Sequence, residues 1–544
     1  MNGLMMDDFP LTLTLAARRA ERFHGHRRVV SRRPDHSLHE TTYGELIGRA
    51  RRLSGGLAEL GIKRGSRVAT LLWNQPEHLE LYFAAPAMGA VIHTLNPRLH
   101  PDELGYIIDH AEDQIVVVDE TLRPVLEKVA TAKSLEHEVV VAHSDPVPAE
   151  ATPYEELIEG SGPADWPALD ERTAAAMCYT SGTTGTPKGV VYSHRSATLH
   201  ALNAALPDAL GISSRDVVLP VVPMFHAFSW GLPYASALTG AGLVLPGPHL
   251  DPVSVLDLLA GEEVTITAGV PSVWMPMLTA LDDEPARWDL SKLGKLVVGG
   301  SAAPPSMIEG YDRHGIELLH AWGMTEMSPL GTACHVPADI GELPEPERTA
   351  YRARQGTAVP LVDIRARNDD GEVPWDDSTM GELEVRGPCV ASGYHGGEGA
   401  DKFTDDGWFR TGDVVTIDER GCIRVCDRSK DLVKSGGEWI SSVDLENALM
   451  GHPAVAEAAV IAIPDERWGE RPLAVIVLAD GEEPDVESLR EHLAGQFAKW
   501  QLPESFEFVE AIPRTATGKW KKTELRERFV PAGASASAQG PPRG

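Results

Sequence analysis

Helix-like and strand-like patterns alternate between residues 41 and 118, and this alternation limits the fold more than any other feature of the sequence. Residues 43–60 repeat apolar side chains at helical spacing, whereas residues 67–72 and 115–118 are short apolar runs typical of buried strands. Because such alternation builds layered domains with parallel sheets, it predicts an α/β fold. The alternation resumes later in the chain, with strands predicted at residues 174–179, 217–222, 295–298 and 364–366.

The pattern shifts near residues 427–434, after which strand and helix patterns continue for about another hundred residues. We therefore expect a large N-terminal domain of layered α/β subdomains (residues 1–427) and a small α+β domain (residues 434–530). Residues 145–170 are rich in Pro, Glu and Ala and resemble a connection rather than a core element. Residues 531–544 have almost nothing to bury, so we expect a disordered tail.

The charge balance excludes some classes of partner. The 544 residues include 49 Lys+Arg and 80 Asp+Glu, which gives a formal net charge of -31. Extended nucleic acid and anionic membranes usually require a basic face on the protein, so neither is an expected partner. Small polyanions remain compatible with this charge, because local donors can bind them.

Cysteine content and hydropathy indicate the compartment. The five cysteines are scattered and odd in number, which is not a disulfide framework, and they read as small buried hydrophobes. The N-terminal residues lack the order of a signal peptide, and no apolar run reaches the roughly 20 residues of a membrane helix. We therefore expect a soluble, cytoplasmic protein with no integral membrane segment.

A loop rich in glycine and hydroxyl groups follows the strand predicted at residues 174–179. Residues 179–189 include three glycines, several Ser and Thr side chains, and Lys188, which is one of only 13 lysines. Close-approaching backbone N–H groups, hydroxyl donors and a point charge suit a polyphosphate. Gly182 and Gly185 are too close together for the Walker pattern, and residues 190–192 predict a strand where that pattern needs a helix. The sequence therefore disfavours a P-loop NTPase.

Further motifs follow this loop in a fixed order. They occupy residues 223–230, 299–304, 321–329, 381–387, 408–413, 427–440 and 513–519. Together they make the chain resemble the adenylate-forming superfamily of acyl-CoA synthetases, luciferases and peptide-synthetase adenylation domains, over roughly residues 10–530. The run 436–447 is most similar to bacterial medium- and long-chain fatty acyl-CoA synthetases, and residues 322–329 also resemble methylthiopropionate ligases.

The resemblance implies an AMP-forming acid–thiol ligase. A carboxylate attacks the α-phosphate of ATP to give acyl-AMP and pyrophosphate, and the CoA thiol then displaces AMP. Neither step needs a nucleophile from the enzyme, but both need charge neutralisation and positioning, which Mg²⁺, lysine and backbone donors provide. The implied small molecules are thus a carboxylic acid, ATP, CoA and Mg²⁺.

The resemblance assigns the ATP site to several motifs. The phosphates would be held by Thr180, Ser181, Gly182, Thr183, Thr184, Gly185 and Lys188. Mg²⁺ would be bound by Glu326 with the Thr180 hydroxyl, and Thr325 would contact the α-phosphate. Adenine would lie against Gly300, Ser301, Ala302, Ala303, His320, Ala321, Trp322, Gly323 and Met324. Without the motifs, Glu326 reads as one of many surface acids and Trp322 as a core aromatic.

The ribose would be bound by Asp413, whose carboxylate can accept both ribose hydroxyls, with Arg428 assisting. Lys519 would bridge the substrate carboxylate and the α-phosphate during adenylation. On composition alone, Lys519, Lys521 and Lys522 read instead as a solvated basic cluster.

The resemblance also implies that the small domain is mobile and rotates between the two half-reactions. The hinge would comprise residues 428–433, with Lys430 at its centre and Lys434 near the nucleotide. The path of CoA would be lined by Gly436, Gly437, Glu438 and Trp439, although two adjacent glycines are often only a turn. The acyl pocket would be lined by His226, Trp230, Val270 and Gly299. A structural role for His226 is as well supported as a functional one.

The leading hypothesis is a fatty acyl-CoA synthetase, and relatives close to this sequence imply a homodimer. The alternative is a CoA ligase for a short or modified acid such as 3-methylthiopropionate, or for an aryl acid. A luciferase-like oxygenase shares the motifs, whereas a carrier-protein loader would need a carrier protein that the chain does not show. A noncatalytic nucleotide-binding module would be expected to lack Lys519 or Glu326, and both are present.

Overall fold

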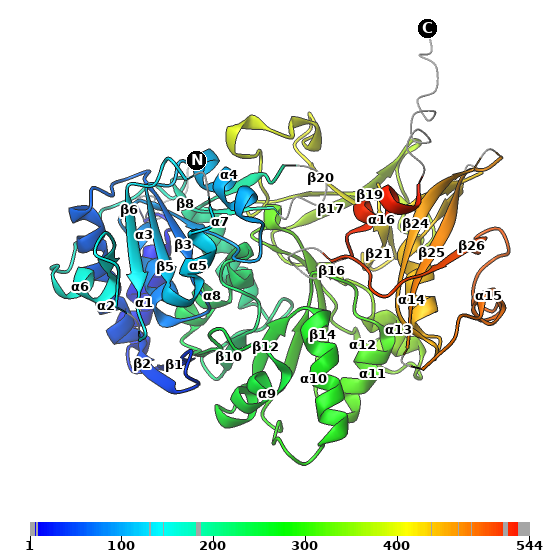
Figure 1. Cartoon of the computed structure of the whole chain (residues 1–544), viewed down its shortest axis with the longest axis horizontal. Coiled ribbons are helices and arrows are strands. Elements are labelled where there is room, and N and C mark those ends of the chain that lie inside the picture. The colour runs from blue at the N-terminus through cyan, green and yellow to red at the C-terminus, as the bar shows by residue number, and fades with distance from the viewer. Residues whose placement is uncertain are drawn as a thin grey trace, which may run out of the picture. The chain divides into compact units, whose positions relative to one another are not determined.

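A computed structural model describes residues 6, 9–129, 132–144, 146–180, 186–436, 438–465, 467–479, 481–514 and 520–530. Within these residues the chain divides into two compact units, each described by itself below (Figure 1). Unit 1 comprises the described residues up to Thr180, Thr186–Asp363 and Val385–Phe409. Unit 2 comprises Ile364–Glu384 and the described residues from Arg410 onward. The predicted boundaries at residues 427, 428–433 and 434–530 remain a prediction.

Unit 1 contains a largely parallel sheet with the strand order β7-β6-β5-β3-β4-β8-β9. Its strands are β3 (Arg67–Leu71), β4 (Val91–Thr94), β5 (Ile115–Asp119), β6 (His137–Val141), β7 (Thr152–Pro153), β8 (Ala174–Tyr179) and β9 (Gly189–Ser193). The strands β3 to β8 pair in parallel, and β9 runs antiparallel to β8. The predicted parallel strands at residues 67–72, 115–118 and 174–179 are therefore confirmed.

A second sheet of unit 1 has the order β16-β15-β14-β13-β12-β10-β11-β1-β2. Its strands are β1 (Arg28–Arg32), β2 (Leu38–Thr42), β10 (Val217–Pro220), β11 (Gly242–Leu245), β12 (Ile266–Gly269), β13 (Lys295–Val298), β14 (Glu317–Gly323), β15 (Leu330–Ala333) and β16 (Thr357–Ala358). Parallel pairs run from β1 through β11, β10, β12 and β13 to β14, and antiparallel strands close both edges.

Helices pack around these two sheets. They are α1 (Leu13–His24), α2 (Tyr43–Glu59), α3 (Pro76–Ala87), α4 (Pro101–Ala111), α5 (Arg123–Leu126), α6 (Tyr154–Glu159), α7 (His194–Ala204), α8 (Leu232–Thr239), α9 (Pro252–Gly261), α10 (Pro271–Asp283), α11 (Pro305–Arg313), α12 (Ala338–Gly341) and α13 (Glu347–Arg352). Helix α2 begins at a capping box in which Thr42 and Glu45 satisfy each other's backbone N–H groups. Its apolar stripe is buried, as the periodicity predicts.

The helices form layers. Helix α7 packs on β8 and β9, α8 packs on β10 and β11, and α7 and α8 pack on each other, so helices lie between the two sheets. On the opposite face of the second sheet, α9, α10 and α11 cover β12, β13 and β14 around a core that includes Trp274, Met307 and Tyr311 (Figure 1). Layered helices and parallel strands confirm the predicted α/β class.

The described part of this predicted connection, residues 146–170, contributes side chains to the core, contrary to the expectation of a simple connection. The segment contains β7 and α6, and it buries Tyr154, Ile158 and Trp166. Leu157 packs against Gly56 of α2, where a Cβ atom would lie 2.7 Å from Leu157 Cγ. The prediction was wrong because one short helical turn shows no repeat of apolar spacing, whereas the surrounding prolines are prominent.

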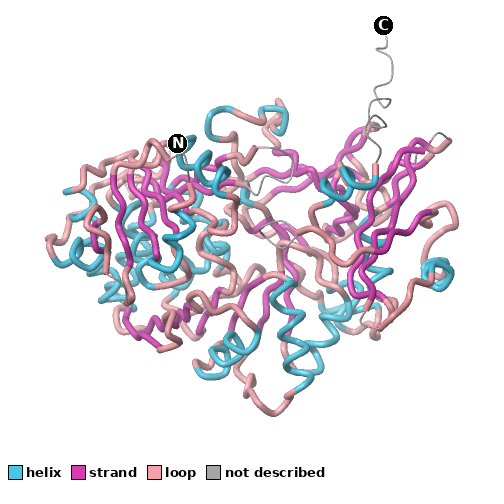
Figure 2. The backbone as a smooth tube through the Cα atoms, viewed as in Figure 1, coloured by secondary structure: helices cyan, strands magenta, loops and turns pink. Residues whose placement is uncertain are grey.

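Unit 2 contains a sheet with the order β18-β17-β19-β20-β21 and a sheet with the order β23-β22-β25-β24, in which β26 also pairs with β25. The first has β17 (Asp363–Asn368), β18 (Gly371–Glu372), β19 (Gly381–Arg386), β20 (Phe409–Ile417) and β21 (Ile423–Arg428). The second has β22 (Val433–Ser435), β23 (Glu438–Ile440), β24 (Val455–Asp465), β25 (Gly469–Leu478) and β26 (Ser505–Phe508). Figure 2 shows β24 and β25 as long neighbouring strands.

The helices of unit 2 are α14 (Ser442–Met450), α15 (Val486–Ala494) and α16 (Lys522–Phe529). Helices α14 and α15 share a core with β22, β24 and β25, and Leu525 of α16 belongs to a separate core that includes Ile461. Helices beside a mainly antiparallel sheet confirm the predicted α+β character of this region. Among the described residues no helix is long and apolar enough to cross a membrane. All five cysteines are buried and none forms a disulfide, as predicted.

Candidate active site

The loop predicted to bind phosphate joins two paired strands of unit 1. Tyr179 at the end of β8 faces Gly189 at the start of β9. The backbone N–H of Thr180 donates to the carbonyl of Lys188 at 2.9 Å, and the Lys188 N–H donates to Thr180 Oγ1 at 3.2 Å. These bonds fix both ends of the loop. Five of its predicted phosphate ligands, Ser181, Gly182, Thr183, Thr184 and Gly185, lie outside the described residues.

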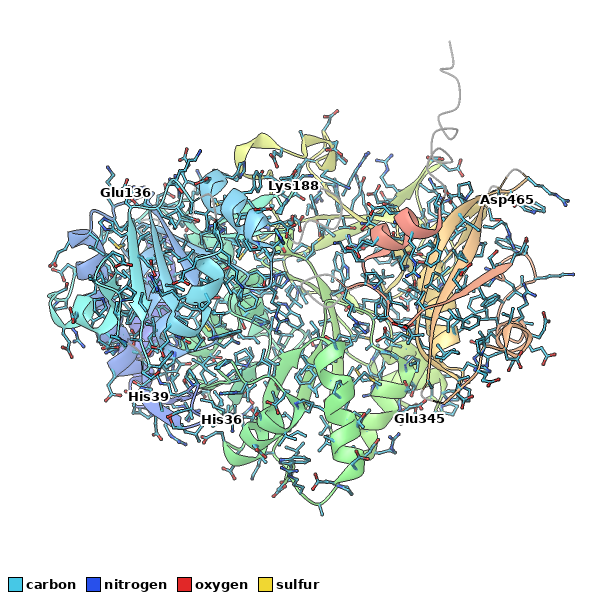
Figure 3. The ribbon with its side chains drawn as sticks, viewed as in Figure 1. His36, His39, Glu136, Lys188, Glu345 and Asp465 are labelled. Carbon is cyan, nitrogen blue, oxygen red and sulfur yellow. The ribbon has the colours of Figure 1, made fainter. Side chains whose placement is uncertain are left out.

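Lys188 and Glu326 both contact Tyr394, a residue that the sequence analysis did not select. The Lys188 ammonium lies 5.4 Å from the centre of the Tyr394 ring, a cation–π distance (Figure 3 labels Lys188). The Tyr394 hydroxyl donates to Glu326 Oε1 at 2.6 Å. In the sequence around Tyr394, the only sign of a functional role is a single tyrosine within a glycine-rich run, residues 387–399.

Glu326 sits in a short 3-10 turn, η3 (Thr325–Met327), that follows β14. The residue is 6% exposed, and its carbonyl accepts a hydrogen bond from the Ala391 N–H at 2.7 Å. The Tyr192 hydroxyl donates to the carbonyl of Thr325 at 2.6 Å. Burial, followed by the charge of Glu326, raises the pKa of Tyr394, so the phenol stays protonated and donates to the carboxylate.

The chemistry of these donors fits a divalent magnesium ion. Mg²⁺ takes oxygen ligands and is often held by one or two carboxylates together with substrate phosphates. Glu326 supplies a buried, oriented carboxylate, and Thr180 supplies a hydroxyl at the end of the loop. Within the described ranges no group of three or more His, Cys, Asp or Glu side chains could hold a metal alone. A Mg²⁺ ion held by Glu326 would complete its coordination with water or phosphate oxygens.

The residues predicted to contact adenine follow β13 or lie in β14. Gly300 has a φ of 79°, and a Cβ atom there would lie 3.3 Å from Val270 Cγ1. Trp322 is half-buried and its ring packs against Gly331. The His320 ring is buried and shares a hydrogen bond with the carbonyl of Ala353 at 3.0 Å. Burial lowers the pKa of His320 to about 4, so this imidazole is neutral near pH 7.

Three of the four predicted acyl-pocket residues, Trp230, Val270 and Gly299, lie close together in unit 1. A Cβ atom on Gly299 would lie 2.8 Å from Trp230 Cη2, so the indole packs directly on this glycine. Val270 lies beside the neighbouring Gly300. The His226 side chain is half-buried, and its backbone N–H donates to the carbonyl of Pro223 at 3.0 Å.

Trp230 belongs to a left-handed turn, η2 (Ala227–Gly231), with φ values of 42°, 55°, 49°, 53° and 73°. Left-handed backbone costs roughly 1–2 kcal/mol for each non-glycine residue. The buried Ser229 hydroxyl offsets part of this cost by donating to the carbonyl of Val222 at 2.7 Å. Gly231 faces the His200 ring, where a Cβ atom would lie 2.4 Å from Nδ1. The surrounding contacts therefore hold a strained backbone in place at a predicted functional site.

The predicted ribose ligands form a pair in unit 2. Asp413 in β20 faces Arg428 in β21, and Arg428 Nε lies 2.7 Å from Asp413 Oδ1. The Asp413 N–H donates to Thr411 Oγ1 at 3.0 Å, and Arg428 also donates to the carbonyl of Thr411 at 3.3 Å. Asp413 is 3% exposed, so its carboxylate is held in one orientation.

The remaining predicted residues also belong to unit 2. Lys430 is exposed between β21 and β22, and desolvation lowers the pKa of its amine. Lys434 pairs with Trp439 across β22 and β23, and Gly436, with a φ of 63°, packs under Trp468. Glu438 begins β23. The predicted Gly437 and Lys519 lie outside the described residues.

Lys522 does not belong to a solvated basic cluster, which corrects the reading from composition. Its ammonium lies 2.6 Å from Glu446 Oε1 and donates to Ser442 Oγ at 2.6 Å. Desolvation of the buried amine lowers the pKa of Lys522, but the charge of Glu446 and its neighbours outweighs this effect, so the pKa is raised overall. Lys521 is exposed and pairs with Glu524 at 2.5 Å.

Comparison with known proteins places the chain in a family. Lys188, at the end of a glycine- and hydroxyl-rich run, and the buried carboxylate of Glu326 meet at Tyr394, and such groups suit nucleotide phosphates. The model of the AMP-binding enzyme family matches residues 16–395, and that of the AMP-binding enzyme C-terminal domain matches residues 444–519. The chain belongs to the AMP-binding enzyme family, which confirms the predicted adenylate-forming superfamily.

Individual relatives match along nearly the whole chain. A long-chain-fatty-acid–CoA ligase from Thermus thermophilus is 49% identical, with 97% of this chain and 99% of the relative covered. A 3-methylmercaptopropionyl-CoA ligase from Ruegeria pomeroyi is 45% identical, also with 97% and 99% covered. The crystal structure of an anthranilate CoA ligase in complex with anthranoyl-AMP has a TM-score of 0.84 at 25% identity, with 96% of this chain and 99% of that chain covered.

Proposed function

We propose that the chain is a fatty acid–CoA ligase that uses ATP. The observation that carries this proposal is the joint contact of Lys188 and Glu326 with Tyr394, beside the fixed ends of the loop. A cation and a buried carboxylate on either side of one tyrosine support the proposal that a polyphosphate and its metal bind here. The ligase relatives, which match nearly end to end, supply the reaction class.

The reaction would proceed in two steps. A carboxylate oxygen of the acid attacks the α-phosphorus of ATP, the bond to the bridging oxygen of the β-phosphate breaks, and pyrophosphate leaves. The CoA sulfur then attacks the acyl carbonyl, the thiol proton is released, and the bond to AMP breaks. Lys188 and Thr180 would hold the β- and γ-phosphates, and Thr325 the α-phosphate. Mg²⁺ bound at Glu326 would neutralise phosphate charge.

The other predicted roles belong to the same proposal. Asp413 and Arg428 would bind the ribose, and Lys519 would neutralise charge between the carboxylate and the α-phosphate. Residues 428–433 would act as a hinge. Contacts across it include Arg424 with Asp444 at 3.1 Å and the Ser442 N–H with Asp427 at 2.6 Å, and a rotation at the hinge would have to break them.

An apolar acid fits the proposed pocket, because Trp230 and Val270 present hydrocarbon surface beside two glycines. The second candidate is a ligase for 3-methylthiopropionate, which the Ruegeria relative favours by its name. We further propose a homodimer and a cytoplasmic location, the latter supported by the five free, buried cysteines.

Pyrophosphate release tests the proposal directly. Purified protein is given ATP and Mg²⁺ with saturated acids from C2 to C18, with 3-methylthiopropionate or with benzoate, each with and without CoA. A fatty acid–CoA ligase releases pyrophosphate with medium or long acids and accumulates acyl-CoA only when CoA is present. Turnover confined to 3-methylthiopropionate would favour the second candidate, and no turnover with any acid would overturn both.

A further inference from the structure

Tyr394 is held in place by contacts on every side. Its ring packs edge-on against Phe403 and Phe409, with ring centres 5.7 Å and 6.5 Å away. Gly399, with a φ of 61°, lies close enough that a Cβ atom there would be 3.1 Å from both the Tyr394 ring and Lys188 Nζ. The ring therefore has little freedom to turn away from Lys188.

The backbone around Tyr394 is tied to the loop that carries Glu326. The Ala391 N–H donates to the carbonyl of Glu326 at 2.7 Å, and the Ser328 hydroxyl donates to the carbonyl of Cys389 at 2.9 Å. On the other side of Tyr394, the His395 ring contacts the carbonyl of His110 at 3.2 Å. Residues 387–399 thus form a strap across unit 1, and the strap fixes Tyr394 relative to Glu326 from two directions.

From this geometry we propose that Tyr394 is a positioning residue for metal-bound ATP, an inference that rests on the proposed function. Its hydroxyl orients the Glu326 carboxylate by a charge-assisted hydrogen bond, and its ring face holds the Lys188 ammonium. Because the rigid Tyr394 side chain lies between Lys188 and Glu326, it prevents the two side chains from forming a direct ion pair. Both charges then stay available for a phosphate and its cation.

The two contacts make separable predictions. In Tyr394→Phe the ring remains over Lys188 but the carboxylate loses its hydrogen bond. Hydrogen bonds to ligating carboxylates typically contribute 10- to 100-fold to metal affinity. Tyr394→Phe should therefore weaken the metal by about tenfold or more while metal-free ATP binds nearly as before. Tyr394→Leu removes both contacts and should weaken metal-free ATP as well.

The experiment measures binding rather than turnover. Mn²⁺ replaces Mg²⁺, and the electron paramagnetic resonance signal of free Mn²⁺ is titrated with the full-length protein in the presence of ATP. Calorimetry gives the affinity for ATP without metal. Tyr311→Phe is the matched control, because Tyr311 also donates one hydrogen bond, to the carbonyl of Trp274 at 2.7 Å, but lies in the core of unit 1.

A loss of Mn²⁺ affinity in Tyr394→Phe that Tyr311→Phe does not show supports the inference. Wild-type Mn²⁺ affinity in Tyr394→Phe, or equal losses in both variants, overturns it. Glu326→Gln separates this result from the proposed function. If Glu326→Gln binds Mn²⁺ as the wild type does, the metal assignment and the inference about Tyr394 fail, whereas pyrophosphate release decides separately whether the chain is a ligase. Thermal melting verifies that each variant is folded.

Discussion

Asp413 and Arg428 face each other across two neighbouring strands, with Arg428 Nε 2.7 Å from a carboxylate that is almost completely buried. An arginine that holds one carboxylate oxygen fixes the direction of the other. If the pair binds a ribose, as proposed, the carboxylate would need little further ordering to accept hydrogen bonds from its two adjacent hydroxyls.

Asp413→Asn should weaken ATP binding roughly 10- to 100-fold, because hydrogen bonds to a charged acceptor are worth about 1.5–3 kcal/mol. It should also remove the preference for ATP over 2′-deoxyATP, which calorimetric titration of both nucleotides measures. Glu384→Gln is a matched control, since Glu384 is a buried acid of the same sheet that pairs with Arg365 at 2.7 Å. An unchanged nucleotide preference in Asp413→Asn would contradict ribose recognition by this pair.

The sequence pattern predicted those helices and strands that form because of interactions between residues close together in the sequence. Helix α2 shows its apolar stripe and capping box within Tyr43–Glu59, and strand β13 is a short apolar run between polar residues. The fixed order of the motifs likewise predicted that Lys188 and Glu326 belong to one site. Each of these features depends on neighbours in the sequence or on a recognised run of residues.

Tyr394 and η2 could not be predicted in this way. Tyr394 meets Glu326 across 68 positions of sequence, so only the folded strap 387–399 reveals the contact. In the left-handed turn at Ala227–Gly231, four non-glycine residues adopt positive φ angles, which their side chains disfavour. The turn exists because tertiary contacts hold it. Lys522 was misread for a similar reason, since its buried partner Glu446 lies in another helix.

Lys519→Ala should reduce acyl-adenylate formation by at least 100-fold, in line with the loss of a group that stabilises developing charge. Thioester formation from supplied acyl-AMP should largely survive, because adenylyl transfer is then already complete. ATP–pyrophosphate exchange measures the first step, and acyl-CoA production from synthetic acyl-AMP measures the second. Lys521→Ala, which removes an exposed lysine of the same segment, should leave both rates unchanged. Equal loss of both rates in Lys519→Ala would refute the assignment.

Lys522→Met should act on stability. Removing one partner of a buried ion pair typically costs about 3–5 kcal/mol, because the remaining charge is left without compensation. Here the stranded group would be the buried carboxylate of Glu446. Urea denaturation should show the loss, and the double variant Lys522→Met with Glu446→Gln should recover part of it. A double variant less stable than Lys522→Met would contradict this account.

The free energy of unfolding should fall as the pH drops below 6.5, and protonation of His320 in the unfolded chain should contribute to this fall. Burial lowers the pKa of His320 from 6.5 to about 4. The unfolded chain therefore binds a proton at this position between pH 6.5 and 4 that the folded chain does not, so this part of the stability is present above pH 6.5 and lost as the pH falls toward 4. The slope for one proton is about 1.4 kcal/mol per pH unit.

His320→Asn keeps a donor near the carbonyl of Ala353 but cannot titrate. Urea denaturation at pH 7.5, 6.5, 5.5 and 5.0 should show a shallower fall in stability for this variant than for the wild type. His26→Asn, at an exposed position, controls for the loss of a histidine elsewhere. Parallel stability curves for His320→Asn and the wild type would exclude His320 as a source of the pH dependence.

Gly299→Ala should shift the enzyme toward shorter acids. Its Cβ atom would lie 2.8 Å from Trp230 Cη2 and 3.2 Å from the carbonyl of Ala321, so the indole must move. An indole pushed into the apolar pocket would shorten it. One methylene of substrate in such a pocket changes kcat/KM by about tenfold or more. The longest accepted acid should therefore lose about tenfold relative to the shortest, measured by pyrophosphate release across the C2 to C18 series.

The Trp230→Ala background decides whether the indole transmits this effect. With the ring absent, Gly299→Ala should no longer change the chain-length profile, because the indole that its methyl group would displace is gone. Gly261→Ala is the control for a glycine-to-alanine change in unit 1, since a Cβ atom at Gly261 meets nothing within 4 Å. The same shift in both backgrounds would mean that Gly299 acts on the acid directly, and a Trp230→Ala profile identical to that of the wild type would remove Trp230 from the pocket.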